Sequence, residues 1–263
     1  MIWGAEIILD IDDEELAFTT EETLNPQRPE TWGELRQTAW THWAVSQIPQ
    51  YKKRTVSNPA LQNRYGGEVL PHVRPAQRFQ ISEDTRLAAR KQWDIPAAAK
   101  VVLFAGTPRK HKGLMQTAHA LVEAQDPKAW LVIMGDFPKG TAQLQKDLQN
   151  LEGLNCRFIP GQPYDQLAPI LALGDIALLL QDSQSLVAQF QLPAKLMDAL
   201  ASGLVVLATA TPAIQHLIDE GVVTQVSEAN VKQALKTALD KLGSGLIQDP
   251  YQFLIPRHPH GTG

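Results

Sequence analysis

Cysteine, long apolar runs and net positive charge are all scarce in this 263-residue chain. Its single cysteine, Cys156, excludes an intramolecular disulfide and a cysteine-based zinc site, and we interpret it as a small buried hydrophobe. No apolar run approaches the roughly 20 residues that cross a bilayer, and the start of the chain lacks the pattern of a signal peptide. We therefore expect a globular protein in the cytoplasm, without a transmembrane segment.

The charge balance narrows the choice of partners. The formal net charge is −4, which gives no general attraction to nucleic acid or to anionic lipid. We expect no nucleic-acid partner, and a site for a polyanion must then be a local basic cluster. One such cluster runs from Arg109 to Lys112.

The familiar phosphate-binding loops are missing as well. The segment "GTPRKHKG", which begins at Gly106, lacks the second glycine of GxGxxG. It is not a P-loop either, because Gly113 is followed by Leu114 rather than by Lys and Ser or Thr. The segment "GDFPKGT", which begins at Gly135, fails the same tests. A nucleotide site of these two kinds is excluded.

The first 75 residues combine a short strand with an acidic run. Residues 6–11 predict a buried strand, and a buried strand so early suggests a chain cut out of something longer. The run "DIDDEE" that follows has two interpretations, a metal site and a solvated or interface turn. The second is favoured because no histidine accompanies the acids.

A helix is predicted to begin near Trp32. Thr31 and Glu34 form a capping box there. Four side chains at helical spacing fall on roughly one face, namely Trp32, Arg36, Trp40 and Trp43. We expect these tryptophans to be core residues, with a ligand-binding aromatic stripe as the alternative.

From Lys100 onward, six short apolar runs alternate with helix-length amphipathic segments. The runs are 101–105, 130–134, 156–159, 175–180, 204–208 and 222–226. This alternation predicts an α/β fold with a doubly wound, parallel, Rossmann-like sheet of about six strands. The expected organisation is a remnant domain and connector at 1–75, a linker and helix at 76–99, the Rossmann-like domain at 100–245 and a tail at 246–263.

Ligands of such sheets bind at the carboxyl ends of the strands. The loop after the first strand offers Gly106, where backbone can approach a ligand, and then Arg109, Lys110 and Lys112 just before a helix that opens at Gly113. Guanidinium and ammonium groups together with a helix amino terminus suit a diphosphate. A solvated basic turn is the alternative.

The segment "PAKLMDALASG" predicts a second functional helix, with Pro193 at its first position and Gly203 after its end. Lys195 then lies in the first turn, where a cation is unfavourable unless an anion shares the site. Asp198, one turn later, can accept hydrogen bonds from paired hydroxyls, as acidic residues do for ribose elsewhere. A surface pair of Lys195 with Asp198 is the alternative.

Taken in order, these segments resemble the carboxy-terminal, donor-binding domain of retaining GT-B glycosyltransferases of the group 1, or family 4, type. The similar segments are "VVLFAGTPRKHKGL", "LVIMGDFP", "CRFIPGQPYDQLAPILALGDIALLL" and "PAKLMDALASGLVVLAT". The resemblance covers about 96–240. Upstream, "IILDIDDEELAF" and "TVSNPALQNRYGGEVLPHVRP" look more weakly like the end of an acceptor domain and the connector.

The resemblance implies a binding site for a nucleoside-diphosphate sugar. Its residues would be Gly106, Arg109, Lys112, Gly135, Leu192, Pro193, Lys195 and Asp198, with His111 as a candidate substrate contact. Arg109 and Lys112 would contact the diphosphate, and Asp198 would replace the family's ribose-binding glutamate. The family's first acid would fall at Phe190 and is absent.

Two functions remain open on this basis. One is a glycosyltransferase, or the donor-binding part of one, that uses no metal and no other cofactor and whose acceptor is an unknown glycan or lipid-linked molecule. The other is a non-catalytic module that binds a nucleotide sugar or a partner. Fewer than about 80 residues precede the donor domain, so a partner chain that supplies the acceptor domain is also left open. A response-regulator fold is excluded because the first strand of the sheet ends in Gly106.

Overall fold

The computed structural model describes residues 6–18, 32–70, 72–74, 79, 81–109 and 112–242. It divides into two compact units. Unit 1 takes Met1–His72, Asp182–Leu192 and Ala210–Asp219, and unit 2 takes Val73–Gln181, Pro193–Thr209 and Glu220–Gly263. Within the described ranges, no helix is both long and apolar enough to span a bilayer.

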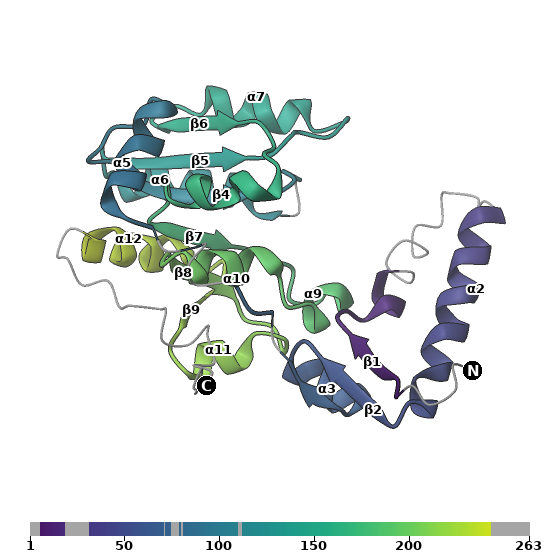
Figure 1. Cartoon of the computed structure of the whole chain (residues 1–263). Coiled ribbons are helices and arrows are strands. Elements are labelled where there is room, and N and C mark those ends of the chain that lie inside the picture. The colour runs from purple at the N-terminus through teal and green to yellow at the C-terminus, as the bar shows by residue number, and fades with distance from the viewer. Residues whose placement is uncertain are drawn as a thin grey trace, which may run out of the picture. The chain divides into compact units, whose positions relative to one another are not determined.

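Unit 2 is built on a six-stranded parallel sheet (Figure 1). Its strands are β4 (Lys100–Ala105), β5 (Ala129–Met134), β6 (Cys156–Ile159), β7 (Ile176–Leu179), β8 (Val205–Thr209) and β9 (Val223–Val226). They lie in the order β6-β5-β4-β7-β8-β9, and every neighbouring pair is parallel. The predicted doubly wound sheet is confirmed. All six expected apolar runs form strands.

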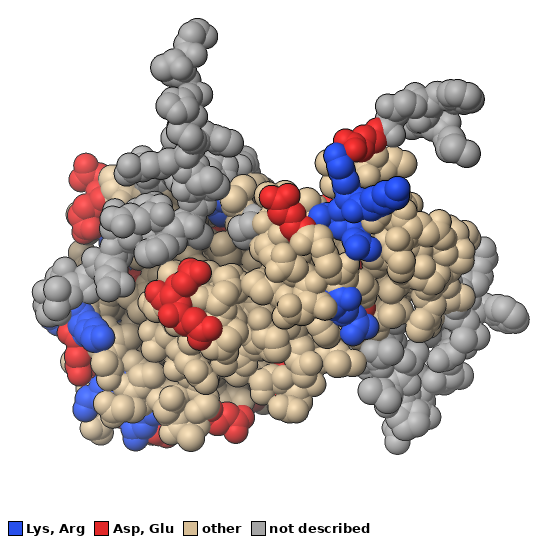
Figure 2. Space-filling model, turned by 90° about the horizontal axis from the view of Figure 1, so that it is seen from below, with Lys and Arg blue, Asp and Glu red and all other residues tan. Residues whose placement is uncertain are grey.

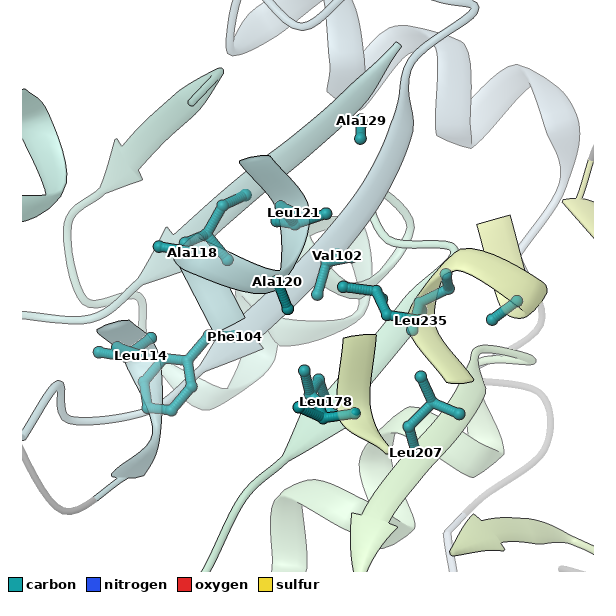
Figure 3. Close-up of a cluster of buried hydrophobic side chains, with 14 of the residues drawn as sticks. Val102, Phe104, Leu114, Ala118, Ala120, Leu121, Ala129, Leu178, Leu207 and Leu235 are labelled. Carbon is teal, nitrogen blue, oxygen red and sulfur yellow. The ribbon is translucent and has the colours of Figure 1, made fainter. Parts of the chain in front are cut away.

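Helices cover both faces of this sheet. They are α5 (Glu83–Gln92), α6 (Leu114–Ala124), α7 (Ala142–Asn150), η3 (Tyr164–Gln166), α8 (Leu167–Leu171), α10 (Ala194–Ala201) and α12 (Val231–Leu242). On one face, Val102, Leu178 and Leu207 of the strands pack with Leu121 and Leu235 of α6 and α12 (Figure 3). Adjacent strand residues point to opposite faces, so the same strands also supply Leu103 and Leu179 to the side of α8 and α10.

Cys156 lies in β6 and packs, partly buried, against the first of these faces. Burial raises the pKa of its thiol to about 12. The side chain therefore behaves as a small apolar group, as expected from the sequence, since a thiol with so high a pKa is not ionised near neutral pH.

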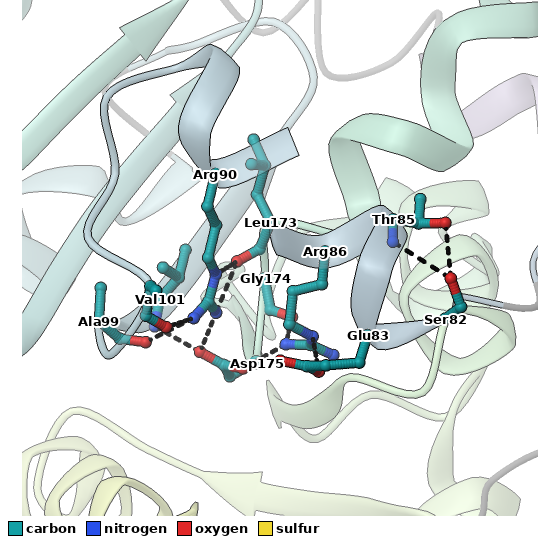
Figure 4. Close-up of polar contacts among 11 residues, drawn as sticks. Ser82, Glu83, Thr85, Arg86, Arg90, Ala99, Val101, Leu173, Gly174 and Asp175 are labelled. Carbon is teal, nitrogen blue, oxygen red and sulfur yellow. Dashed lines mark hydrogen bonds and ion pairs between the residues drawn. The ribbon is translucent and has the colours of Figure 1, made fainter. Parts of the chain in front are cut away.

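A buried polar network ties α5 to the sheet (Figure 4). Arg86 and Arg90 of α5 both pair with the carboxylate of Asp175, which also accepts a hydrogen bond from the Val101 backbone N–H at 2.7 Å. Arg90 is only 4% exposed and donates further to three carbonyls, those of Ala97, Ala99 and Leu173. Each buried charge is thus paired and hydrogen-bonded.

Unit 1 contains a smaller, three-stranded parallel sheet in the order β1-β2-β3. Its elements are β1 (Ile8–Ile11), α2 (Trp32–Gln47), η1 (Ile48–Gln50), β2 (Lys53–Val56), α3 (Pro59–Tyr65), β3 (Glu68–Val69), α9 (Leu186–Phe190) and α11 (Gln215–Asp219). One apolar cluster among its described residues contains Ile11, Ile48, Val56 and Leu61. The side chain of Asn58 caps α3 by accepting from the Ala60 and Leu61 N–H groups.

For two segments of unit 1, the burial that the sequence predicted is wrong. The early strand forms, but Ile7 and Ile8 are 64% and 59% exposed. Ile7 precedes β1, and Ile8 points away from the face on which Leu9 and Ile11 pack. The helix begins at Trp32 as predicted, yet Trp40 and Trp43 are also more than half exposed. They pack edge to face on each other, with ring centroids 5.4 Å apart, and they line an open groove beside β1. The side chains of Trp32 and Arg36 and the capping box lie outside the described part.

The acidic run is not simply a solvated turn. Glu14 is 3% exposed and pairs with Arg64, and its Oε2 accepts a hydrogen bond from the Tyr65 hydroxyl at 2.6 Å. Asp12 pairs with His72. In the described part of the chain, no group of three His, Cys, Asp or Glu side chains is arranged to hold a metal ion. Burial of Glu14 arises because α3 carries its two partners next to the strand end.

Candidate functional site

The topology of unit 2 marks one edge of its sheet. From β4 the chain continues outward to β5 and β6, and then it returns to β7 on the other side of β4 before it continues to β8 and β9. The strand order therefore reverses between β4 and β7. In open α/β sheets, ligands bind outside the carboxyl ends of the strands at such a point. The loop that follows β4 and the helix α10, between β7 and β8, are the elements to inspect (Figure 1).

The turn from β4 to α6 depends on two glycines. Gly106 has φ of 136° and Gly113, the N-cap of α6, has φ of 68°, both in the region that favours glycine. A Cβ on Gly113 would lie 2.4 Å from Cβ of Leu180, whereas one on Gly106 would meet nothing within 4 Å. Gly113 is thus required for packing, and Gly106 leaves open space beside the backbone.

Gly135 directly follows β5, just as Gly106 directly follows β4. It has φ of 142°, and a Cβ there would lie 2.1 Å from the carbonyl oxygen of Gly106. The two loops consequently lie backbone to backbone, and the Gly106 N–H donates to Met134 at 2.9 Å. Gly135 supports the shape of the Gly106 loop through this contact.

Among the described residues, Arg109, Lys112 and Lys195 are basic side chains at this edge. Arg109 is exposed, and Lys112 is half-buried directly before α6. Burial, followed by the positive charge of Arg109, lowers the pKa of Lys112. Lys110 and His111, the candidate substrate contact, lie outside the described residues.

Lys195 of α10 is the third cation. Its Nζ lies 5.1 Å from the ring centroid of Phe104, at the end of β4, and it lines a small cavity of about 20 Å³. Burial, and then the charge of Lys112, lower the pKa of Lys195 to about 8. Among the described residues, no carboxylate pairs with either lysine. Two mutually repelling cations next to a helix amino terminus form a site that an anion would stabilise.

The helix α10 is placed almost as the sequence predicts. Pro193 is its N-cap, with φ of −66°, rather than its first helical residue, and Gly203 follows its end with φ of 76°. The first-turn position of Lys195 is confirmed. Leu192, which precedes the helix, is buried and belongs to unit 1.

Asp198 has a partner that the sequence did not predict. Its Oδ1 accepts from Nε of Arg74 at 2.5 Å, and the pair is largely shielded from solvent. The surface pair between Lys195 and Asp198, which was the alternative explanation for these residues, is not among the ion pairs of the described chain. Arg74 lies 124 residues upstream in the connector. No local spacing could have linked it to α10.

Phe190, which stands where the related family has its first acid, ends α9 in unit 1. Its ring packs against the small core of that unit and lies 5.2 Å from the Arg64 guanidinium carbon. Its carbonyl accepts from the Asn58 side-chain amide at 2.8 Å. Residue 190 therefore packs in the core of unit 1 and supplies no carboxylate.

Comparison with known proteins agrees with this arrangement. The family model described as glycosyl transferases group 1 matches residues 85–245, which is more than half of the chain. WcaI of Escherichia coli strain K12, named as a glycosyl transferase of colanic acid biosynthesis, is 31% identical over 154 residues. That match covers 57% of this chain but only 37% of WcaI.

Solved structures share the fold at low sequence identity. The glycosyltransferase WaaG, involved in lipopolysaccharide biosynthesis, has a TM-score of 0.66 and 18% identity, and the match covers 95% of this chain and 70% of WaaG. Anabaena HepE, solved in complex with UDP and glucose, has a TM-score of 0.57 and 16% identity over 93% of this chain and 69% of HepE. The α/β fold is that of GT-B glycosyltransferases, and the chain belongs to the glycosyl transferases group 1 family.

Proposed function

We propose that this chain is the donor-binding part of a glycosyltransferase that works in the cytoplasm. In this proposal, unit 2 binds a nucleoside-diphosphate sugar at the carboxyl ends of β4 and β7. The sugar is then transferred to a hydroxyl of a saccharide acceptor, either a free glycan or a lipid-linked one. Membership of the family and the naming of WcaI as a glycosyl transferase of colanic acid biosynthesis support this choice.

The observation that carries the proposal is the cationic pair at the strand-order reversal. Lys112 and Lys195 are partly buried, and their positive charges repel each other. Among the described residues, no carboxylate forms an ion pair with either of them. A diphosphate would neutralise both and would also meet the amino terminus of α6. The same interactions strengthen as negative charge develops on the leaving diphosphate, so they favour the transition state over the ground state.

Charge neutralisation by these side chains requires no metal ion or other cofactor in the proposed reaction. Arg109 adds an exposed cation to this site, and its planar guanidinium group suits a phosphate. Binding and turnover should accordingly persist in a chelator such as EDTA. Loss of either on chelation would contradict the metal-free proposal without contradicting the donor site.

The alternative function, a binding module without catalysis, is favoured by one observation. The Phe190 side chain packs against the core of unit 1. This position therefore lacks the acid that the family resemblance associates with the sugar. Such a module would bind the nucleotide sugar and leave it intact. A measurement of turnover therefore distinguishes the two functions, whereas a measurement of binding does not.

The first experiment is isothermal titration of the chain with UDP-, GDP- and ADP-sugars. Lys112→Ala and Lys195→Ala should each weaken binding about tenfold or more, because hydrogen bonds to charged groups contribute about 1.5–3 kcal/mol. Lys128→Ala is the matched control, since Lys128 is exposed just before β5, at the opposite end of the strands. Equal effects of all three variants, or no binding by the folded chain, would refute the donor site.

A second experiment measures release of the nucleoside diphosphate with saccharide acceptors present. Release that depends on acceptor and falls in Lys112→Ala supports transfer. Tight binding of an intact donor, without release under any acceptor, supports the non-catalytic module.

A further inference from the structure

The pairing of Arg74 with Asp198 assigns a role to a residue outside the expected donor site. Arg74 reaches α10 at two points. Its Nε contacts Oδ1 of Asp198 at 2.5 Å, and its Nη2 lies 3.4 Å from the carbonyl oxygen of Ala194, one turn earlier. The guanidinium therefore spans the first two turns of the helix that also carries Lys195. The contact with the Ala194 carbonyl holds the planar guanidinium in place, and its contact with Oδ1 then restricts the rotation of the Asp198 carboxylate.

The pairing leaves half of the carboxylate available. Nε of Arg74 contacts Oδ1, and no donor among the described residues is recorded on Oδ2. A carboxylate has about four acceptor positions, so one arginine nitrogen occupies only part of its capacity. With Asp198 and Arg74 each about one-seventh exposed, the free oxygen is partly sheltered from competing water. Such an oxygen suits a neutral hydroxyl donor.

The pairing also keeps opposite charges on α10 apart. Lys195 and Asp198 are three residues apart, a spacing at which helical side chains are neighbours and readily pair. Asp198 nevertheless pairs with Arg74, and Lys195 is left without a protein carboxylate in the described chain. Arg74 thereby leaves Lys195 open to an anion from outside.

We propose that Arg74 is a positioning residue that holds Asp198 to accept hydrogen bonds from the ribose hydroxyls of the bound nucleotide. This inference rests on the proposed function. Asp198 has a shorter side chain than glutamate, so it has less freedom to adjust its reach, and its orientation has to be set by a neighbour. Arg74 itself does not touch the reacting atoms in this role.

The test is discrimination between ribose and deoxyribose. The dissociation constant is measured for the nucleoside diphosphate that binds best among UDP, GDP and ADP, and for its 2′-deoxy and 3′-deoxy forms. In the unmodified chain, at least one deoxy form should bind about tenfold more weakly, because the carboxylate then loses a hydroxyl partner. Arg74→Ala should reduce that ratio to near one, as should Asp198→Asn.

Arg74→Lys keeps the charge but not the two-point fork, and it should restore the ratio only in part. Lys112→Ala is the control for the phosphate contacts, since it should weaken all three ligands equally and keep the ratio. A structural role alone would change the affinity and leave the ratio intact. Folding of each variant is checked by circular dichroism, and Arg74→Lys keeps the test decisive if Arg74→Ala does not fold.

Three results would overturn the inference. They are an unchanged ratio in Arg74→Ala, tighter nucleotide binding in that variant, which would make Arg74 a competitor of the ligand, and a ratio near one in the unmodified chain. Each of these leaves the donor site standing. Failure of the unmodified chain to bind any of the three nucleotides would instead refute the proposed function.

Discussion

Units 1 and 2 are both built on parallel sheets, but they differ in how fully those sheets are covered. Strands β4, β5 and β7 of unit 2 are buried along almost their whole length, with helices on both faces. In the described part of unit 1, the apolar cluster under the small sheet has four buried residues, and a groove of about 600 Å³ lies along Trp40, Trp43 and β1. Burial on both sides produces the continuous apolar runs that are typical of parallel strands. Similar runs do not guarantee burial, as Ile7 and Ile8 show.

The largest expected effect tests the polar network of unit 2. Asp175→Ala removes the carboxylate that both Arg86 and Arg90 contact, and it leaves the buried guanidinium of Arg90 without a carboxylate. The free energy of unfolding should fall by about 3–5 kcal/mol, as when one partner of a buried pair is removed. Urea unfolding measures it. Glu123→Ala is the control, since Glu123 lies in α6 and forms an exposed ion pair with Lys232 at 2.9 Å, and it should change stability by less than about 1 kcal/mol.

The equivalent test in unit 1 uses Glu14. Glu14→Ala leaves the Arg64 and Tyr65 side chains without their shared acceptor and should cost about 1–3 kcal/mol. Because the core of unit 1 is small, the loss should appear mainly as faster hydrogen exchange in β2 and α3, with β4 and β5 little affected. Glu6→Ala, which removes an exposed pair with Lys53, is the control. Uniform acceleration in both sheets would show that the two units unfold together.

Lys195 makes the stability of unit 2 depend on pH in the alkaline range. The folded-state pKa of about 8 lies below the ordinary 10.5, because burial disfavours the charged amine. Below pH 8 the amine is protonated in both the folded and the unfolded chain, and the cost of burying its charge is fully present. Between about pH 8 and 10.5 the unfolded chain binds more protons, so stability rises with pH.

Lys195→Met should therefore be more stable than the unmodified chain at pH 7, by about 1–2 kcal/mol after allowance for partial exposure, and the difference should shrink toward pH 10. Denaturant titrations at pH 7, 8, 9 and 10 measure both curves. Parallel curves would contradict the lowered pKa. Bound nucleotide should remove the difference at pH 7, since an anion stabilises the charged amine.

The smallest expected effect concerns the exposed tryptophans of unit 1. Trp43→Ala should change the free energy of unfolding by no more than about 1 kcal/mol, the contribution of an edge-to-face aromatic pair. A core tryptophan would cost about 3–5 kcal/mol instead. Leu131→Ala in unit 2 is the contrasting variant, because Leu131 is fully buried in β5. A large loss for Trp43→Ala would contradict its exposure.

Sequence patterns predicted unit 2 well because local periodicity and burial coincide there. Each apolar run in 100–245 forms a strand, and Gly106, Gly113 and Gly203 adopt positive φ values at the turns where they were expected. Lys112 and Lys195 also lie at the amino termini of α6 and α10, as the sequence predicted.

What the sequence did not predict depends on distant partners. The contact of Arg74 with Asp198 joins residues 124 positions apart, and the burial of Glu14 depends on Arg64 and Tyr65, about 50 positions downstream. No periodicity encodes such pairs. The exposure of Trp40 likewise depends on how much sheet is available to cover a helix, which the helix sequence does not specify.

The chain passes several times between its two units, and this affects how proteolysis or a hinge motion would act on the protein. The backbone passes between the units after residues 72, 181, 192, 209 and 219. A single proteolytic nick therefore cannot release either unit, and any hinge would have to turn at five peptide connections at once. One of them, Leu192 to Pro193, enters α10 two residues before Lys195, and the proline ring restricts its φ. The helix that carries Lys195 and Asp198 is therefore joined to α9 of unit 1 by a connection of only three residues, Gln191 to Pro193.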